Sequence, residues 1–525
     1  MGIFSVFGRK RPATVPTDRI IPLRYWDDLH YLRSICHAFT FRFDDVLDVV
    51  KLEAALGRLM EIGDWGQMGA RLRLNVESFS NLTMKSHPNG LSQDHGKLEY
   101  HIPARYDKTR PPFIFTTTTY GMSISDHPLG SQLPKSDQDQ SFLSPSSGFF
   151  TSLVCHPSSP RELADWIYTD RPQLNIHTAL FNDATLLTIS YIHTFADAVA
   201  RTNFFNAWIA VLRGKEEEVP AFVPYDHDPL HTLGETPPRQ SYSNIGRLLS
   251  GFSLMMFGIR YMFEILCSPR LEEHPIRLPG RCVDRMRETV LQDLAVTTPK
   301  GAEKPLVSEC DTFVSEGDVV VAWWIRTMIK ALKPAPDRTI MVMNVFNVWS
   351  LFPEWFPHGA AGLIGNSFFY SYTLLVASKV LQDINLKYVA FTNRRALMEH
   401  RTKEQVEAMT AIQRGNFMRA APVVGDSKLL FMAATNHHKA RYFETDWSAA
   451  VISPGVPLSG RPHALGRPSY INDIEYCHGY PSRNIVRIIG KDAAGDWHLL
   501  FKARAGAWPV IHQELMDLIE TEMRD

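Results

Sequence analysis

A histidine and an aspartate, separated by three positions, have the types and spacing that proton-transfer chemistry requires. His193 follows residues 185–192 (TLLTISYI), which predict a strand, and Asp197 precedes residues 198–213, whose apolar positions predict a helix. Asp197 therefore stands where a helix N-cap is expected. A histidine, with an ordinary pKa of about 6.5, can take the proton of an alcohol at neutral pH, and the aspartate would fix the turn and orient the imidazole. The pair suits acyl transfer to an alcohol or an amine; taken alone, it also fits a structural histidine at the end of a strand.

Other kinds of catalytic centre find little support in the sequence. It has no GxSxG elbow, and no cysteine near a helix start has an evident histidine partner, so a covalent acyl-enzyme is not expected. The adjacent His437 and His438 would alternate faces on a strand and lack a third ligand, so no metal site is expected. The 6 cysteines are scattered without a CxxC pair, which favours a reducing compartment over a disulfide scaffold.

Composition and charge narrow the class of protein. The 525 residues are 45% hydrophobic and 21% charged, which suits packed domains rather than a disordered chain. Lys plus Arg total 55 against 56 for Asp plus Glu, a net charge of −1, so we expect no nucleic-acid partner. Residues 1–11 do not resemble a secretory signal, because their apolar stretch is short and precedes the basic cluster. We therefore expect a cytoplasmic protein.

The elements that position the histidine and aspartate alternate between strands and helices. Further elements are predicted as follows: helices at 47–62, 318–333 and 506–523, and a strand at 339–346. Residues 121–148 predict a long surface loop, and the proline-rich residues 215–243 predict the start of a crossover between two halves of similar size. This alternation predicts a two-lobed α/β protein.

The most apolar segment comprises residues 245–266 (IGRLLSGFSLMMFGIRYMFEIL). Arg247, Arg260 and Glu264 limit its uninterrupted apolar run to about a dozen residues, below the roughly twenty that span a bilayer. We expect a buried helix or the wall of a substrate tunnel. Association with a membrane surface through this helix is the less favoured alternative.

Several motifs, taken in order, resemble those of one enzyme family. Residues 193–214 (HTFADAVARTNFFNAWIAVLRG) are similar to the HxxxDG motif and the following helix of the BAHD acyltransferases. Further matches follow in the family's order: 21–27 (IPLRYWD), 69–72 (GARL), 313–323 (FVSEGDVVVAW), the pair Gly365 and Asn366, and 442–450 (YFETDWSAA), which resembles a divergent DFGWG motif around Asp446. The resemblance covers most of residues 20–525 and is strongest to the fungal branch, which includes trichothecene 3-O-acetyltransferase.

This resemblance implies two chloramphenicol-acetyltransferase-like lobes with a central channel between them. Acyl-CoA would enter the channel from one side and a small hydroxylated acceptor from the other. His193 occupies the position of the family's general base, and the implied reaction is direct transfer in a ternary complex, with acyl-CoA as co-substrate and no permanently bound cofactor. The implied division of the chain is as follows: a flexible N-terminus at 1–19, an N-terminal lobe at 20–214, a crossover with the apolar helix at 215–300, and a C-terminal lobe at 301–525. Two lobes in one chain suggest a monomer.

The sequence departs from the family's pattern in both motifs. Ala198 replaces the glycine after the first motif's aspartate, a mild change if that position has ordinary helical dihedrals. Asp446 keeps the acid of the second motif, but the glycines are lost. In the family that motif is structural and remote from the catalytic histidine, so we expect the change to be tolerated.

Two roles in the implied reaction have no obvious residue. Many relatives pair the first motif's aspartate with an arginine in the segment matching residues 341–353, where no arginine occurs. Either Asp197 has another partner, such as Asn344 or Asn347, or its role is weaker. Thr435 is the candidate donor to the oxyanion, because relatives carry a polar residue there; a hydroxyl bonded to its own backbone is the alternative.

Together these observations predict a CoA-dependent O-acyltransferase acting on a hydroxyl of a fungal-type secondary metabolite, with acetyl as the commonest donor. An amine acceptor would use the same histidine. A condensation domain is disfavoured, because Ile192 stands where that family has a second histidine. The alternative class is a non-catalytic descendant that binds a metabolite or a partner protein. Candidate cations for the CoA phosphates are Arg394, Arg395, Lys439 and Arg441.

Overall fold

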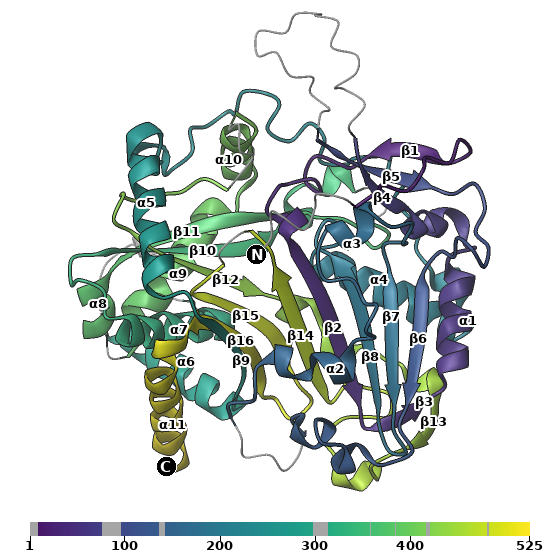
Figure 1. Ribbon diagram of the computed structural model, residues 1–525. Helices are drawn as coiled ribbons and strands as arrows, with labels where there is room; N and C mark the ends of the chain where they lie inside the picture. Colours follow the sequence, from purple (N-terminus) through teal and green to yellow (C-terminus); the bar gives the residue numbers. More distant parts are fainter. Residues whose placement is uncertain are drawn as a thin grey trace, which may run out of the picture.

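Two main sheets, each with its own hydrophobic core, organise the protein (Figure 1). This computed structural model describes residues 9–75, 96–135, 142–297, 313–356, 359–383, 385–415, 421–479 and 482–524. Residues 1–8 of the predicted flexible N-terminus lie outside the described residues, as does part of the predicted surface loop at 121–148.

The first sheet contains the strand that leads to His193. Its members are β2 (Ile35–Phe43), β6 (Ile114–Thr119), β7 (Asn175–Leu180), β8 (Thr185–Ile192) and β14 (Tyr470–Cys477). They lie in the order β14-β2-β8-β7-β6, and β6 and β7 are the parallel pair. Every residue of β8 is buried, which suits its apolar and β-branched residues. The predicted strand at 185–192 is confirmed.

The second sheet is larger and mixed. Its members are β9 (Leu271–Leu278), β10 (Thr339–Asn347), β11 (Phe368–Val376), β12 (Leu430–Asn436), β15 (Ile485–Lys491) and β16 (Trp497–Arg504). Their order is β11-β10-β12-β15-β16-β9, with β10, β12 and β15 mutually parallel. Parallel neighbours need crossover connections: helices supply the one from β10 to β12, and the one from β12 to β15 passes through strands β13 and β14 of other sheets. The predicted strand at 339–346 is β10.

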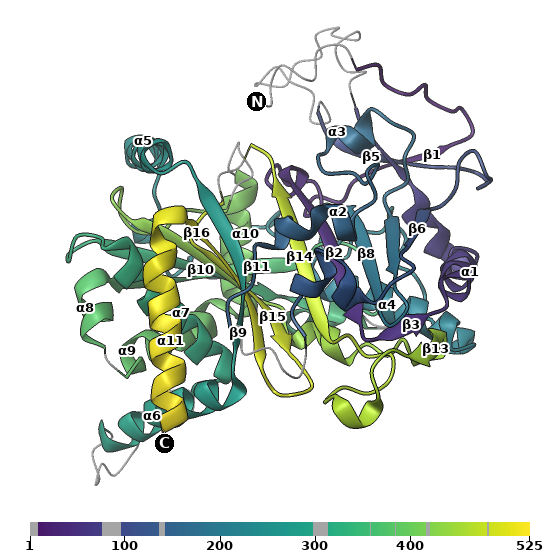
Figure 2. The ribbon, with the colours of Figure 1, turned by 60° about the horizontal axis from the view of Figure 1, so that its bottom comes forward.

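Four of the helices match those predicted from apolar spacing. They are α1 (Val49–Leu59), α4 (Ala198–Leu212), α7 (Glu316–Leu332) and α11 (Trp508–Arg524). The remaining helices apart from α5 are α2 (Thr151–Val154), α3 (Ala164–Ile167), α6 (Gly280–Thr297), α8 (Ala377–Gln382), α9 (Lys387–His400) and α10 (Lys403–Gly415). Helices α7, α9, α6 and α11 pack on one another beside the second sheet, as Figure 2 shows.

The C-terminal half contributes two strands to the N-terminal half. Strand β14, from the last quarter of the chain, pairs antiparallel with β2 along its whole length in the first sheet. Likewise β13 (Val451–Pro454) pairs with β3 (Asp45–Leu47). Both strands lie in the range that we assign to the C-terminal lobe, so the lobes are tied by backbone hydrogen bonds. The division of the chain at residues 214 and 300 remains a prediction.

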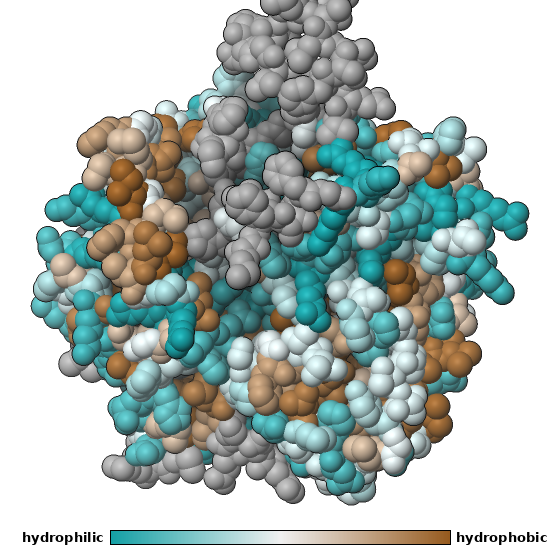
Figure 3. Space-filling view, viewed as in Figure 1, coloured by the Kyte–Doolittle hydropathy of each residue, from teal (hydrophilic) through white to brown (hydrophobic). Residues whose placement is uncertain are grey.

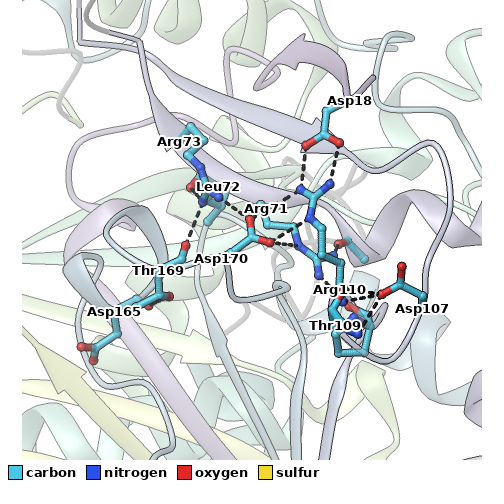
Figure 4. A network of polar contacts seen from close by, with 12 residues as sticks. Asp18, Arg71, Leu72, Arg73, Asp107, Thr109, Arg110, Asp165, Thr169 and Asp170 are labelled. Atoms are coloured by element: carbon cyan, nitrogen blue, oxygen red, sulfur yellow. Dashed lines mark hydrogen bonds and ion pairs between the residues drawn. The ribbon is translucent and has the colours of Figure 1, made fainter. Parts of the chain in front are cut away.

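The turn that resembles the family's Gly-Arg-Leu motif is a structural anchor. Arg71 is fully buried and is the first residue of β4 (Arg71–Leu74), which forms a small sheet with β5 (Leu98–Ile102) and β1 (Arg19–Pro22). Figure 4 shows the three arginines that converge on Asp170: Arg73 at 2.5 Å, Arg110 at 2.8 Å and Arg71 at 3.7 Å. Arg110 also donates two hydrogen bonds of 2.7 Å to Asp18. The network ties this small sheet to the loop before β7.

The most apolar segment forms a helix whose outer face is exposed. Helix α5 (Gly251–Cys267) has no buried residue, which corrects the expectation of a buried helix or a tunnel wall. Its exposed side chains are Phe252, Leu254, Met255, Ile259, Met262, Phe263 and Leu266. They form the brown area over α5 in Figure 3. The inner stripe packs on the second half, for example through Tyr261 on Phe431, and nothing in the described chain covers the rest. None of the described helices is long and apolar enough to cross a membrane.

Candidate active site

His193 lies in the turn between β8 and α4, and backbone hydrogen bonds fix that turn. Its N–H donates to the carbonyl oxygen of Ile35 at 2.9 Å, at the start of β2. Its own carbonyl oxygen accepts a 3.0 Å hydrogen bond from Nδ2 of Asn366. The ring lies edge-on to Phe368, with 5.8 Å between ring centroids. Both sides of the turn are therefore held, one by each half of the protein.

The surroundings of the His193 ring favour its neutral form. Protein groups enclose the ring while the residue keeps partial solvent exposure. Burial, followed by the nearby His37 and Arg201, lowers the pKa of His193 from 6.5 to about 4. Nδ1 is buried and has no hydrogen-bond partner among the described residues. At neutral pH the ring is thus uncharged and can accept a proton.

Asp197 is the N-cap of α4, as predicted, and four donors converge on its carboxylate. Oδ1 accepts from the N–H groups of Val199 and Ala200, each at 2.9 Å. Oδ2 accepts from Ser367, at 3.0 Å from the backbone N–H and 3.2 Å from Oγ. The Asp197 N–H donates to the Gly365 carbonyl oxygen at 3.1 Å. Burial nevertheless raises the pKa of this carboxyl. The carboxylate joins the start of α4 to the segment before β11.

The sequence did not identify the partner of Asp197, and in the structure that partner is Ser367. Neither predicted alternative contacts the carboxylate directly: Asn347 donates to Oγ of Ser367 at 2.9 Å, one step away, and Asn344 donates to Asn393 at 2.8 Å. The segment beside Asp197 is the loop before β11, and not β10, so Ser367 holds the carboxylate. The one clue to Ser367 in the sequence is that it directly follows the Gly365-Asn366 pair.

Gly365 and Asn366 connect this turn to the opening segment of the chain. Asn366 donates to Oδ1 of Asp27 through its backbone N–H at 2.6 Å and its side chain at 2.9 Å. A Cβ on Gly365 would lie 3.0 Å from both Arg24 Nη1 and Asp27 Oδ2, so a side chain there would displace this contact. Burial raises the pKa of Asp27 to about 7, against the opposing effect of Arg24. His193, Asp197, Gly365 and Asn366 thus form one hydrogen-bonded unit.

Thr435 lies near the end of β12 in the second sheet. Its Oγ1 is buried and has no hydrogen-bond partner among the described residues. Nδ1 of His437, two residues on, is also buried without a partner in the described part of the chain. Since a buried hydroxyl without a partner costs roughly 1–3 kcal/mol, it is a candidate for contact with a bound molecule. The alternative, a hydroxyl bonded to its own backbone, does not occur.

Asp446 lies at the opposite end of α4 from Asp197. It accepts a 2.5 Å hydrogen bond from Arg213, just after the helix, and its neighbour Trp447 packs edge-on against Trp208 at 5.1 Å. With a rise of about 1.5 Å per residue, the helix separates the two motifs by roughly 20 Å. The geometry around Asp446 is that of a clamp on the helix end, far from His193.

Of the four cations singled out for phosphate binding, two lie in one group. Lys439 follows β12, and Arg394 and Arg401 lie on and just after α9. Burial, and then Arg401 and Arg394, lower the pKa of Lys439. Arg394 approaches Asp318 at 3.8 Å. Arg395 is exposed, and Arg441 pairs with Glu444 at 3.6 Å. Arg401, which sequence reasoning missed, completes a cluster of three cations.

Sequence reasoning also missed a buried polar group beside His193. His37 on β2 has its ring centroid 5.4 Å from that of His193, and it contacts Asp473 on β14. Arg201, on α4, donates hydrogen bonds to the hydroxyls of Tyr191 and Tyr442. No local pattern links these residues, since they come together only through sheet pairing. Within the described residues no group of three or more His, Cys, Asp or Glu could hold a metal ion.

Comparison with known proteins adds relatives over the full length of the chain. No protein-family model matches the sequence. Acetyltransferase sphE of Aspergillus fumigatus is 37% identical over 535 residues, covering 98% of each chain. Acetyltransferase adrJ of Penicillium rubens is 35% identical over 522 residues, covering 99% of each. A protein named transcriptional regulator calD, of Penicillium decumbens, is 33% identical and covers 98% of this chain and 99% of its own.

Solved structures share the fold at low sequence identity. The structure of F. sporotrichioides TRI101 complexed with coenzyme A and T-2 has a TM-score of 0.63 and 12% identity, covering 94% of this chain and 97% of its own. Vinorine synthase has a TM-score of 0.55 and 13% identity, covering 97% and 96%. These likenesses confirm the predicted α/β fold with two chloramphenicol-acetyltransferase-like lobes. Together with the full-length acetyltransferase relatives, they place this chain in the fungal branch of the BAHD-like acyltransferases.

Proposed function

We propose that the protein is a CoA-dependent O-acyltransferase that moves an acyl group, acetyl in the first instance, from acyl-CoA to a hydroxyl of a secondary metabolite. The observation that carries this proposal is His193: a neutral, partly exposed imidazole in a turn that both halves hold. Relatives named acetyltransferase, and the coenzyme A in the TRI101 structure, support the donor. TRI101 was also solved with T-2 or deoxynivalenol, small molecules that support an acceptor of this class.

His193 would act as general base on the acceptor hydroxyl. Because Nδ1 is buried, we assign Nε2 as the atom that takes the proton. The acceptor oxygen then forms a bond to the thioester carbonyl carbon. When the tetrahedral intermediate collapses, the carbon–sulfur bond breaks, and the protonated His193 returns its proton to the departing CoA sulfur. Atoms and charges balance without an acyl-enzyme, and the same route serves an amine acceptor.

The tetrahedral intermediate carries negative charge on the former carbonyl oxygen, and Thr435 is our candidate to stabilise it. Its buried Oγ1 has no partner among the described residues, so its proton is available for an incoming oxygen. A donor that is already desolvated and fixed in a strand costs little reorganisation when the charge develops. Thr435 therefore lowers the barrier without contributing to the resting fold.

The cluster of Lys439, Arg394 and Arg401 is the candidate site for the CoA phosphates. Burial, and then repulsion by Arg401 and Arg394, lowers the pKa of Lys439, and a bound phosphate would relieve that repulsion. Among the described residues, the ion pair of Arg394 is with Asp318 at the long distance of 3.8 Å, so most of the cluster's charge has no paired carboxylate there. Guanidinium groups suit phosphate oxygens because they can donate two hydrogen bonds at once.

A second candidate is a non-catalytic descendant that binds a metabolite or a partner protein. It draws support from the relative named transcriptional regulator calD, at 33% identity, and from the lost glycines around Asp446. The intact unit around His193 and Asp197 argues for catalysis, because a binding protein has no need for a neutral, partly exposed base.

Turnover of acyl-CoA by the purified protein tests the proposal. Free CoA release would be followed with acetyl-, malonyl- and benzoyl-CoA, for the wild type and for His193→Ala. His512→Ala on the exposed face of α11 is the matched control. Because many transferases leak slowly to water, an acceptor need not be known. Release that disappears in a folded His193→Ala protein and persists in the control supports the enzyme. Unchanged release in His193→Ala overturns the assigned base, and no release or binding with any donor favours the binding protein.

A further inference from the structure

A second imidazole lies beside His193 and has no part in the steps above. His37, on β2, has its ring centroid 5.4 Å from that of His193. On its other side it stacks on Tyr191, also at 5.4 Å, with 19° between the ring planes. His37 is 6% exposed, so its polar atoms need a partner inside the protein.

That partner is a carboxylate from the far end of the chain. His37 Nδ1 lies 3.0 Å from Oδ1 of Asp473 on β14. Oδ2 of the same carboxylate accepts a 2.9 Å hydrogen bond from Arg487 on β15. Burial acts to raise the pKa of Asp473, but His37, Arg487 and Arg201 together hold it well below its usual range. Asp473 is therefore ionised, and Nδ1 of His37 donates to it.

From this arrangement we propose that His37, held by Asp473, is a positioning residue that acts through His193, restraining the His193 ring at the end of β8 and opposing positive charge on that ring. The inference rests on the proposed role of His193 as general base. The Asp473 hydrogen bond fixes the tautomer and plane of His37, and the fixed ring limits the rotamers open to its neighbour.

Charged and titratable groups face this pair of rings from every element packed around it. The nearest are Asp473 and Glu475 on β14, Arg201 on α4, Tyr191 on β8 and His437 just after β12, and behind them lie Arg487 on β15, Glu273 on β9, Lys502 on β16 and Tyr442 in the turn Tyr442–Glu444. The carboxylates are neutralised by cations: Glu475 by Lys502 at 2.9 Å, and Glu273 by Arg487 at 2.8 Å.

At His193 the balance of these charges is positive. After burial, His37 is the largest influence that lowers the pKa of His193, ahead of Arg201, while Glu475 opposes them. A general base must be unprotonated when the acceptor arrives, so a neighbour that repels the proton extends the working range toward acidic pH. The same repulsion also makes His193 a weaker base, which offsets part of the gain at high pH. The main effect of His37 is therefore on the pH at which activity falls, and its effect on the plateau is smaller.

The test is the pH dependence of kcat/KM for acyl transfer in His37→Asn and His37→Gln. Both amides can donate to Asp473, as Nδ1 does, but neither carries charge. His463→Gln is the matched control, because it removes another buried histidine–carboxylate pair, 3.1 Å from Asp44, that is absent from the groups acting on His193. Thermal unfolding of each variant shows whether it is folded.

The sign of the effect follows from the charges. Loss of His37 lets the pKa of His193 rise, so protonation inactivates the base at a higher pH. A rise of about one unit, from about 4, lowers the activity at pH 5 from roughly nine-tenths of its plateau to about half. We expect this twofold loss at pH 5, relative to pH 8, in both His37 variants and not in His463→Gln.

Each outcome decides the inference. A matching upward move of the acid limb in the His37 variants supports it. A uniform loss at all pH values, or an unchanged profile, overturns it, since either result leaves His37 with packing alone. Should His37→Gln fail to fold, His37→Asn carries the same test. Failure of the proposed function is distinguishable, because it shows as retained activity in His193→Ala whatever the His37 variants do.

Discussion

Replacing Asp197 by alanine should destabilise the protein much more than the same change at Asp48. Both aspartates are helix N-caps, Asp48 at α1 and Asp197 at α4. Asp48 accepts one hydrogen bond, 2.9 Å from Lys51 N–H, at an exposed site. Asp197 is buried and accepts four, two from α4 and two from Ser367. The comparison separates the effect of capping from the effect of joining two segments.

The expected magnitudes follow from those partners. Loss of an exposed cap costs about 1 kcal/mol, which is the expectation for Asp48→Ala. At Asp197 the same cap is lost, and the buried N–H of Ser367 is left without a partner at a further cost of roughly 1–3 kcal/mol. Removing a carboxylate whose burial already raises its pKa returns part of this cost. We therefore expect Asp197→Ala to lower the free energy of unfolding by about 2–4 kcal/mol.

Denaturant unfolding followed by tryptophan fluorescence measures both variants, and Asp197→Asn completes the series. The amide keeps one acceptor oxygen, so we expect an intermediate loss of stability and partial retention of activity. If Asp197→Ala costs no more than Asp48→Ala, the junction with Ser367 contributes nothing and the reasoning fails. If Asp197→Asn loses as much activity as Asp197→Ala while staying more stable, the carboxylate charge acts in the reaction itself.

Three further predictions concern single residues. Burial raises the pKa of Asp27 to about 7 in the folded protein, against 3.8 in the unfolded chain. The proton bound in the folded state therefore contributes fully to the free energy of unfolding below pH 3.8, and this contribution is lost as the pH rises through 7. Asp27→Asn keeps the acceptor for Asn366, so its stability relative to the wild type should rise by about 2–3 kcal/mol from pH 5 to pH 8. Denaturant unfolding at the two pH values measures this change, and an equal difference at both contradicts the prediction. Thr435→Val removes a hydroxyl that has no partner in the described structure, so we expect an unchanged melting temperature and a kcat about 100-fold lower, and a kcat within twofold of wild type excludes the oxyanion role. Lys439→Ala should raise the KM for acetyl-CoA about tenfold, as expected for one lost charged contact, and leave the KM for the acceptor unchanged; the reverse pattern would place Lys439 at the acceptor side.

Much of the local structure around the site could be read from short stretches of sequence. The helix at 198–212 and its cap at Asp197 depend on contacts within about four residues, whereas the strand at 185–192 was predicted from the types of its own residues and forms its hydrogen bonds with β2 and β7; the structure reproduces all three. The motif order also predicted the two-lobed fold. Apolar spacing predicted α5 as a helix, but it could not say which surface would cover it. The expectation of burial was wrong because the described chain supplies cover for only the inner stripe.

The partners of the site residues were decided by tertiary structure alone. Asp197 meets Ser367 across 170 residues of sequence, and His37 meets Asp473 across 436. Neither pairing follows from periodicity, because it depends on which strand lies beside which: β14 pairs with β2, and the segment before β11 closes on the turn after β8. The sequence by itself determined the turn between β8 and α4 and the candidate residues, His193 and Asp197, that lie in it. Only the fold, by bringing distant charges into one buried space where water cannot screen them, decided that His193 is neutral and what holds it in place.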